Sequence, residues 1–500
     1  MLGAVWTLEE ARLADQRAEA GGVPKGALLA QAGLQLARFI QHRVPDGRVV
    51  VLAGPGSNGG DGWVAARHLV RFRPVTVIPV AEPRFPDAEN WVSAARAAGV
   101  SVSLCHEDLS AAAVVVDAIY GTGFHGAVAK SPAGPWLQAV AERDLPVIHV
   151  DLPSGVDTNS GHYDGPKLRS LATLTMGAAK WGLVSYPAAE ATGDLVVADI
   201  GLFSETTTAH FTDPRWAKNT VPGMTRIGHK YDRGHVVVIG GSAAMPGAPV
   251  LAGLGALAAG AGLVELVVPR GTWGRVAVSP ALIVHGVHET ADGSLQLSDT
   301  LVERAARADA LVIGPGLGPT APPTILDALS ELHVPAVLDA DGIRIYAQSG
   351  ANLGSHWVLT PHAGEMGAIL GRTAKDVNQN RRQAVLDAVQ KTSRALLLKG
   401  LYTLIGSPNG PIRVNPTGSA ALATAGSGDV LSGMVASLLA QGIKPEDALA
   451  LASYWHGFAG ELGGAARGIS LTSMDLVEYL GPAWRVIQQE VAPSGVSYWR

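Results

Sequence analysis

Three short strings in the first half of the sequence place glycines and carboxylates at the ends of apolar runs. They begin at Gly54 (GPGSNGGDG), at Asp117 (DAIYGTG) and at Asp151 (DLPSG). Successive glycines let backbone N–H groups approach a phosphate closely, because no Cβ stands in the way. A carboxylate that ends an apolar strand is seldom idle, and it can give or take a proton. These strings predict a phosphate-binding site with acid–base groups beside it.

The second half carries one such string, TAGSGDVLSG, from Thr424 to Gly433. Its glycines precede a helical pattern, so free N–H groups and the positive end of the helix dipole would meet at one place. Asp429 stands beside that anion site and could accept a proton from a hydroxyl during phosphoryl transfer. The strings GxxxxGK[ST], HExxH and GxSxG do not occur in the sequence, which excludes P-loop, zincin and α/β-hydrolase motifs.

The elements that must position these residues alternate between β-branched runs and Ala-rich helical segments. Near-continuous apolar strands separated by helices are typical of parallel sheets covered on both faces, and their ligands bind at the carboxyl ends of the strands. The sequence therefore predicts two α/β domains built on parallel sheets. The expected strands are 49–53, 75–80, 114–119, 147–150 and 195–200, followed by 235–241, 263–269, 311–314, 336–339, 357–360 and 395–399.

A polar, Pro-containing segment from Phe203 to Arg233 interrupts the alternation and is expected to be a linker. Because 500 residues exceed what one hydrophobic core serves, we divide the chain into residues 1–212 and 213–500. No fixed-period repeat relates the halves, which favours fusion of different domains. The uncharged stretch 243–264 has the length of a membrane span, but its Ala, Gly and Pro content predicts a buried helix packed on a sheet.

The composition favours small-molecule partners. A formal net charge of −5 with interleaved signs offers no footprint for nucleic acid or an anionic membrane. Cys105 is the single cysteine, which excludes an intramolecular disulfide and fits a reducing cytoplasm. The first ten residues lack a secretory signal pattern. We expect a cytoplasmic homo-oligomer.

The strings of the first half resemble the NAD(P)H-hydrate epimerase family over residues 1–210, including the later Asp199-Ile-Gly201. The resemblance implies a Rossmann-like parallel sheet with flanking helices, and it makes Asp151 the acid–base group at C6 of the hydrated nicotinamide. It implies a K⁺ ion held by Asn58, Asp117 and Ser154, a set of hard oxygen ligands. The implied substrate-binding residues are Ser57, Asn58, Gly59, Gly60, Asp61, Gly121, Thr122, Gly123, Phe124, His125, Gly126 and Ala127.

Residues 225–480 are similar to the NAD(P)H-hydrate dehydratase family and imply a ribokinase-like α/β domain. The matching strings are HKYDRG at His229, GPGLG at Gly314, DADG at Asp339, PHAGE at Pro361 and KGLYT at Lys399, with the string containing Asp429. Ala363, Ala425 and Ser427 depart conservatively from the family pattern. The resemblance makes Asp429 catalytic, with Ala248, Gly318 and His362 facing the hydrate. The implied nucleotide-binding residues are Lys399, Gly400, Leu401, Tyr402, Thr403, Gly426, Ser427 and Gly428.

The fusion of these two domains implies a two-step repair reaction for hydrated NADH and NADPH. The first domain would interconvert the R and S hydrates. The second would phosphorylate the S hydrate with ADP and eliminate phosphate to give NAD(P)H, AMP and inorganic phosphate, and ATP could replace ADP as the phosphoryl donor. Mg²⁺ is expected because phosphoryl charge needs a counter-ion.

Several alternatives stay open at the level of sequence. Two GxGxxG matches in one domain argue against an NAD-dependent dehydrogenase, which should have one. The second domain could be an ordinary small-molecule kinase, and the first a non-catalytic binding module. Asp61 could merely cap a helix beginning at Gly62, and His362 with Glu365 could be a surface pair or metal ligands. Asp117, Asp151 and Lys399 could each be structural.

Overall fold

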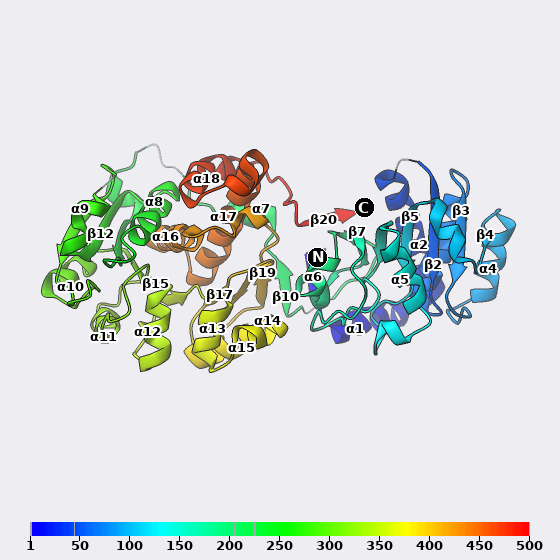
Figure 1. Cartoon of the computed structure of the whole chain (residues 1–500), viewed down its shortest axis with the longest axis horizontal. Helices are drawn as coiled ribbons and strands as arrows, with labels where there is room; N and C mark the ends of the chain where they lie inside the picture. The colour runs from blue at the N-terminus through cyan, green and yellow to red at the C-terminus, as the bar shows by residue number, and fades with distance from the viewer. Residues whose placement is uncertain (1–2, 45, 205–206, 224–226, 278, 500) are drawn as a thin grey trace. The chain divides into compact units, whose positions relative to one another are not determined.

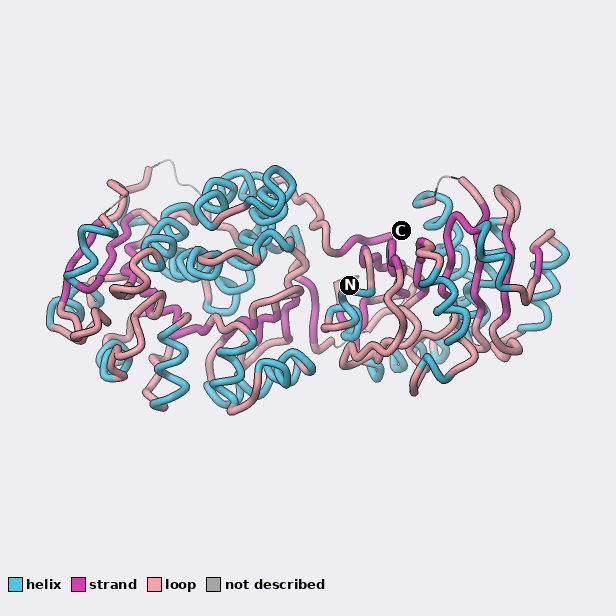
Figure 2. Tube along the Cα trace, viewed as in Figure 1, coloured by secondary structure: helices cyan, strands magenta, loops and turns pink. Residues whose placement is uncertain are grey.

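A computed structural model describes residues 3–44, 46–204, 207–223, 227–277 and 279–499 of the chain. The chain divides into two compact units (Figure 1). The first comprises Met1–His210 together with Ser494–Arg500, and the second comprises Phe211–Pro493. In both units helices alternate with strands along the trace (Figure 2).

The first unit is built on an eight-stranded sheet in the order β20-β9-β7-β6-β5-β2-β3-β4. Its strand pairs are parallel, as predicted, but the apolar runs predicted only β2, β3, β5, β6 and β9 and missed β4, β7 and β20. The chain runs outward from β2 through β3 to β4 and then returns to place β5 on the other side of β2. The bounds are β2 Arg48–Ala53, β3 Val75–Pro79, β4 Ser101–Val102, β5 Ala112–Ala118, β6 Pro146–Val150, β7 Arg169–Met176, β9 Asp194–Ala198 and β20 Val496–Trp499.

Helices cover both faces of this sheet, because alternate strand residues are apolar on each side. Val49 and Val51 belong to one buried cluster, and Val50 and Leu52 belong to another. α2 (Lys25–Arg43), α3 (Ser57–Leu69), α4 (Ala88–Ala97) and α5 (Gly134–Glu142) supply the layers. At the N-terminal end, β1 (Val5–Trp6) pairs with β8 (Ala179–Lys180) and leads into α1 (Leu8–Ala20), which opens with the capping box of Thr7 and Glu10.

The second unit contains a ten-stranded sheet in the order β10-β19-β18-β17-β16-β15-β14-β11-β12-β13. Strands β11 to β17 pair in parallel, whereas β18 is antiparallel to both β17 and β19. The sequence predicted these parallel strands except β13, and it did not predict the antiparallel edge. The bounds are β10 Ala209–Phe211, β11 His235–Ile239, β12 Leu263–Pro269, β13 Ile283–Val287, β14 Ala310–Ile313, β15 Ala336–Leu338, β16 Trp357–Leu359, β17 Leu396–Leu398, β18 Leu404–Gly406 and β19 Ile412–Val414.

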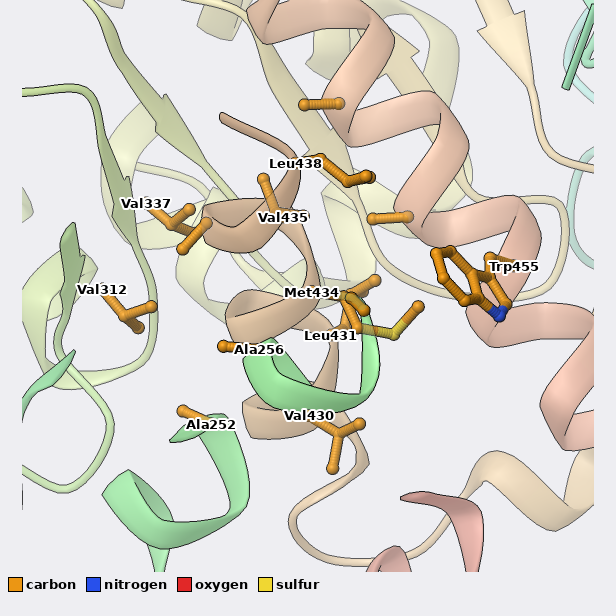
Figure 3. Close-up of a cluster of buried hydrophobic side chains, with 14 of the residues drawn as sticks. Ala252, Ala256, Val312, Val337, Val430, Leu431, Met434, Val435, Leu438 and Trp455 are labelled. Atoms are coloured by element: carbon orange, nitrogen blue, oxygen red, sulfur yellow. The ribbon is translucent and has the colours of Figure 1, made fainter. Parts of the chain in front are cut away.

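One face of this sheet is covered by α16 (Ser427–Ala440), which packs against β11, β14 and β15. Figure 3 shows α16 side chains, including Met434 and Leu438, between the strands, the neighbouring α8 (Ala248–Ala258) and Trp455 of α17 (Pro445–Arg467). Helices α16 and α8 approach so closely that a Cβ at Gly433 would lie 1.8 Å from the Ala252 carbonyl oxygen. α18 (Ser473–Gln488) also packs on α8, and α12 (Asp341–Ser349), α13 (Ala363–Leu370) and α15 (Arg381–Thr392) lie on the opposite face (Figure 1).

Two sequence expectations are settled by these elements. The uncharged stretch 243–264 forms α8 and the start of β12, and among the described residues no helix is long and apolar enough to cross a membrane. The segment from Phe203 to Arg233 is more than a linker: it contains β10 and α7 (Pro214–Thr220), whose first turn is capped by Asp213. These elements escaped prediction because they are too short to show a hydrophobic period.

Candidate functional site

The first unit holds a cavity of about 920 Å³ at the carboxyl ends of its central strands. It lies where the strand order reverses, next to the loops that follow β2 and β5, which is where open parallel sheets bind ligands. Of the residues predicted to bind substrate, those on its wall are Ser57, Asn58, Asp61, Gly121, Thr122, Gly123, Phe124 and His125, and Asp151 joins them.

The other predicted substrate residues lie outside this wall. Gly59 and Gly60 are buried in the first turn of α3, where a Cβ at Gly59 would lie 1.9 Å from the Gly54 carbonyl oxygen. Gly126 and Ala127 follow the wall residues along the chain. The two buried glycines therefore let α3 start directly against the strand ends, and this places Asn58 and Asp61 at the cavity.

Asp151 is held at the cavity by an unusual backbone conformation and by three donors. Its φ is 65°, in the left-handed region that non-glycine residues seldom adopt. Its Oδ1 accepts hydrogen bonds from Lys180 Nζ at 2.5 Å, from Thr175 Oγ1 at 3.1 Å and from the Met176 N–H at 3.2 Å. Its Oδ2 lies 3.4 Å from where a Cβ of Gly121 would stand. Oδ1 of Asp151 is therefore held by hydrogen bonds, whereas Oδ2 lies on the side of the cavity.

Lys180 is a functional candidate that sequence reasoning missed. Its ammonium is buried, with 4% of the side chain exposed, and also donates to Thr175 Oγ1 and the Met176 carbonyl. A buried lysine is rare unless it is paired. The sequence offered one weak signal, a lone lysine among small residues.

Asp117, Asn58 and Ser154, the residues expected to hold K⁺, come from three separate elements. The Asp117 carboxylate is fully buried and accepts hydrogen bonds from Ser154 Oγ at 2.6 Å, from the Ser154 N–H at 2.9 Å and from His149 Nδ1 at 2.9 Å. The Asn58 amide nitrogen is buried with no hydrogen-bond partner in the described part of the chain. Carboxylate, hydroxyl and amide oxygens are the ligands that a hard cation prefers, so the chemistry of these three side chains fits K⁺.

The role of Asp61 as a helix cap is wrong. α3 begins at Ser57, four residues earlier than that interpretation requires, and its N-cap is Gly56. Asp61 is instead 8% exposed on the cavity wall. Burial raises its pKa well above the ordinary value, and the nearby charges of Asp151 and Asp15 raise it further, while Lys180 lowers it.

In the second unit the predicted anion site forms at the start of α16. Gly426, with φ 88°, is the N-cap, and Asp429 lies in the first turn without a capping hydrogen bond from its side chain. The Ser427 carbonyl lies 2.9 Å from His456 Nε2, which fixes the turn from the buried α17. The free N–H groups of this first turn remain available to an anion.

Three charged side chains, Lys399, Asp339 and Glu365, act on Asp429 at the start of α16. The Lys399 ammonium pairs with Asp339 Oδ1 at 2.7 Å, and a Cβ at Gly428 would stand 3.3 Å from it. Burial raises the pKa of Asp429 to about 7, with a further rise from Asp339 and Glu365 and a decrease from Lys399. Asp429 can therefore exchange a proton near neutral pH, as a general base must. Lys399 therefore forms an ion pair with Asp339 and also lowers the pKa of Asp429.

The predicted nucleotide loop, Lys399 to Thr403, connects β17 to β18 and depends on a residue that sequence reasoning missed. Gly400 has φ 140° and Tyr402 has φ 51°, and Thr403 Oγ1 donates to the Gly400 carbonyl. Leu401 is exposed. Buried Arg381 donates to the carbonyls of Lys399 and Leu398, so its guanidinium shapes the loop from α15. Arginine in an otherwise apolar helix face was the available signal.

Two helix starts hold the residues expected to face the hydrate. Asp341 Oδ2 accepts from the Gly318 N–H at 3.0 Å, and Arg344 Nη2 donates to the Gly318 carbonyl at 2.9 Å. Gly318 itself has φ 99°. His362 is the N-cap of α13 and forms a capping box with Glu365.

Ala248 lies at the start of α8, and His362 and Glu365 lie at the start of α13. Ala248, at the start of α8, lies beside the loop at Gly316, where a Cβ would stand 3.3 Å from the Ala248 Cβ. The Glu365 carboxylate is close enough to Lys399 and Asp429 to influence both pKa values. Helix capping explains the His362 and Glu365 spacing, and among the described residues no group of three or more His, Cys, Asp or Glu could hold a metal.

The fold and both sites define a two-unit α/β protein with a ribokinase-like second unit. A ribokinase-like superfamily protein from Enterococcus faecalis shares that fold, with a TM-score of 0.50 and 24% identity, covering 59% of this chain and 99% of its own. The family model for NAD(P)H-hydrate dehydratase matches residues 236–482, and the model for the YjeF-related protein N-terminus matches residues 25–182.

Relatives match along nearly the whole chain. The bifunctional NAD(P)H-hydrate repair enzyme of Moorella thermoacetica is 38% identical over 94% of this chain and 94% of its own length. The enzyme of the same name from Thermofilum pendens is 33% identical over 97% of this chain and 96% of its own. The chain belongs to the family of bifunctional NAD(P)H-hydrate repair enzymes.

Proposed function

We propose that this chain repairs hydrated NADH and NADPH in two steps, one in each unit. The first unit epimerises the hydrate at C6, and the second unit dehydrates the S epimer at the expense of ADP or ATP. The observation that carries the second step is Asp429, a carboxyl with a pKa of about 7 in the first turn of α16 beside Lys399.

In the second unit, the N–H groups at the start of α16 and the Lys399 ammonium stabilise charge on the transferring phosphoryl group. Asp429 removes the proton from the C6 hydroxyl, and that oxygen attacks the β-phosphorus of ADP. Transfer of the phosphoryl group releases AMP and makes the C6 oxygen a good leaving group. Phosphate then leaves C6 while a proton is lost from C5 to solvent, and the C5–C6 double bond of NAD(P)H forms. The loop from Lys399 to Thr403, with Gly426, Ser427 and Gly428, holds the nucleotide. Mg²⁺ bound to the nucleotide phosphates would supply charge neutralisation.

The other second-unit roles follow from the loop contacts. Gly318, whose N–H and carbonyl are both fixed by α12, and the loop next to Ala248 would form the wall for the hydrate. His362 would approach it from the start of α13. The kinase-like fold thereby acts as a lyase, because the phosphorylated alcohol eliminates before it is released.

In the first unit, the cavity receives the hydrated nicotinamide, and Asp151 acts as the acid–base group at C6. Ser57, Asn58 and the loop from Gly121 to Ala127 bind the remainder of the dinucleotide. K⁺, bound by Asn58, Asp117 and Ser154, would supply a positive charge for the pyrophosphate. We also propose that the protein works in the cytoplasm as a homo-oligomer; the exposed single cysteine supports a reducing compartment.

The decisive experiment incubates purified protein with a mixture of R and S NADH hydrate and follows the absorbance of restored NADH. With ADP and Mg²⁺ the S epimer should disappear first and the R epimer should follow through epimerisation. NADH formation without a nucleotide would contradict the dehydratase mechanism. Accumulation of a phosphorylated alcohol without NADH would indicate the rival function, a small-molecule kinase fused to a binding module.

A further inference from the structure

The cavity of the first unit contains more carboxyls than the proposed epimerisation has used so far. Asp61 reaches it from α3, Asp151 from the end of β6, and Asp15 from α1, while Lys180 of β8 is the ammonium among them. The four groups interact electrostatically. The carboxyls therefore compete for a single buried positive charge.

The Lys180 ammonium contacts Asp151 and not Asp61. Lys180 Nζ contacts Asp151 Oδ1, and Thr175 and the Met176 N–H add two more donors to the same oxygen. In the described part of the chain, no hydrogen bond reaches the Asp61 carboxyl. Its helix packs tightly against apolar neighbours, since a Cβ at adjacent Gly60 would lie 2.7 Å from Leu29 and 2.9 Å from Phe85. A carboxyl without donors in such surroundings retains its proton.

We propose that Asp61 is a second catalytic residue of the epimerase, the general acid that works with Asp151 as the general base. This inference rests on the proposed epimerase function. Both side chains line the same cavity. Asp151 receives hydrogen bonds from donors, as an ionised carboxylate requires, whereas Asp61 receives none from the described residues. Two carboxyls whose surroundings separate their protonation states form the usual basis of an acid–base pair.

The chemistry of the hydrate suits such a pair, because C6 carries both a hydroxyl and the ring nitrogen N1. Asp61 gives its proton to the C6 hydroxyl, the C6–O bond breaks as water leaves, and the N1 electron pair forms a C6–N1 double bond. A water molecule then adds to C6 on the opposite ring face while Asp151 accepts its proton. Proton exchange with solvent returns both carboxyls to their starting states. No oxidant or further reactant is required.

This route differs from its main competitor in the fate of one oxygen atom. Ring opening at the C6–N1 bond would give an aldehyde that recloses on the other face with its oxygen retained. The acid–base route replaces that oxygen with one from solvent. Epimerisation by the full chain in H₂¹⁸O, without ADP, should therefore place one ¹⁸O in each inverted molecule, after subtraction of an enzyme-free sample. Inversion with the original oxygen retained would overturn the proposal.

The matched variants are Asp61→Asn and, as a control, Glu82→Gln, whose side chain is exposed on the surface of the same unit. Asp61→Asn should slow epimerisation by ~10²- to 10⁴-fold, the usual contribution of a general acid, while Glu82→Gln should retain the wild-type rate. An Asp61→Asn protein with wild-type melting behaviour and more than about a tenth of the wild-type rate would overturn the proposal.

The pH profile of the wild-type protein tests the same role without a substitution. Burial and the charges of Asp151 and Asp15 raise the pKa of Asp61, and Lys180 opposes them. The acid form is the active form, so kcat/KM for epimerisation should fall as pH rises through that elevated pKa, and Asp61→Asn should lack this decline. A wild-type rate that only increases with pH would overturn the proposal. Absence of any epimerisation by the wild type would refute the proposed epimerase instead.

Discussion

Replacing Asp429 with Asn gives the sharpest test of the second unit, because catalysis and stability should respond in opposite directions. Asn has the shape of Asp but cannot accept the hydroxyl proton. Removal of a general base costs ~10² to 10⁴ in rate. Asp429 makes no side-chain capping hydrogen bond, so the substitution removes no cap from α16. We expect turnover of S-hydrate to fall by that factor while α16 stays folded.

The stability effect follows from the pKa of Asp429, which burial raises from 3.8 to about 7. Between those values the folded state holds a proton that the unfolded state has lost, so the free energy of unfolding decreases as pH rises. Above pH 7 the decrease in the free energy of unfolding that the ionised Asp429 causes no longer changes with pH. A rise of about 3 pKa units corresponds to at most about 4 kcal/mol at 1.4 kcal/mol each. Asn does not ionise and removes this cost, although Lys399 loses a favourable neighbour.

The assay combines turnover of purified S-hydrate with the melting temperature at pH 6 and pH 8. The Asn variant should melt no lower than wild type at pH 8 and should show a smaller loss of stability between the two pH values. Wild-type turnover should increase as pH rises through about 7, because the base form of Asp429 is the active form. A folded variant that keeps more than about a tenth of wild-type turnover would refute catalysis by Asp429.

Three further substitutions address the remaining parts of the sites. Asp151→Asn should leave R-hydrate unrepaired while S-hydrate is consumed normally, as chromatography of the two epimers would show; equal loss of both would contradict its role. Arg344→Gln removes a charged donor to the Gly318 carbonyl, worth ~1.5–3 kcal/mol, and should raise KM for the hydrate ~10- to 100-fold without changing KM for ADP. An equal rise in both would indicate general disruption. Asp117→Asn should abolish the rise in melting temperature that K⁺ gives over choline, and an unchanged rise would place the cation elsewhere.

The sequence was sufficient for most of the parallel strands, although not for β7 and β13, and for the motifs at the strand ends, since both depend on local patterns. Apolar runs predicted the central strands, and the glycine strings placed Asn58, Asp151 and Asp429 at strand or helix ends. Lys180 and Arg381 could not be found in this way. Each acts through contacts that only the folded chain brings together, and the sequence marks each of them only weakly, as a lysine among small residues and as an arginine on a largely apolar helix face. The antiparallel β18 and β19 escaped prediction because strands of three residues show no periodicity.

The last strand, β20, is an edge strand of the first unit's sheet, although the second unit separates it in sequence from β9, its partner. During translation the ribosome must therefore complete residues 211–493 before β9 can be covered. Until then the nascent first unit presents an open sheet edge, the feature from which strand-to-strand aggregation begins. A gene fragment ending near residue 210 would leave that edge open permanently. Expression of the first unit alone should include residues 494–500, joined by a short connection or supplied as a peptide.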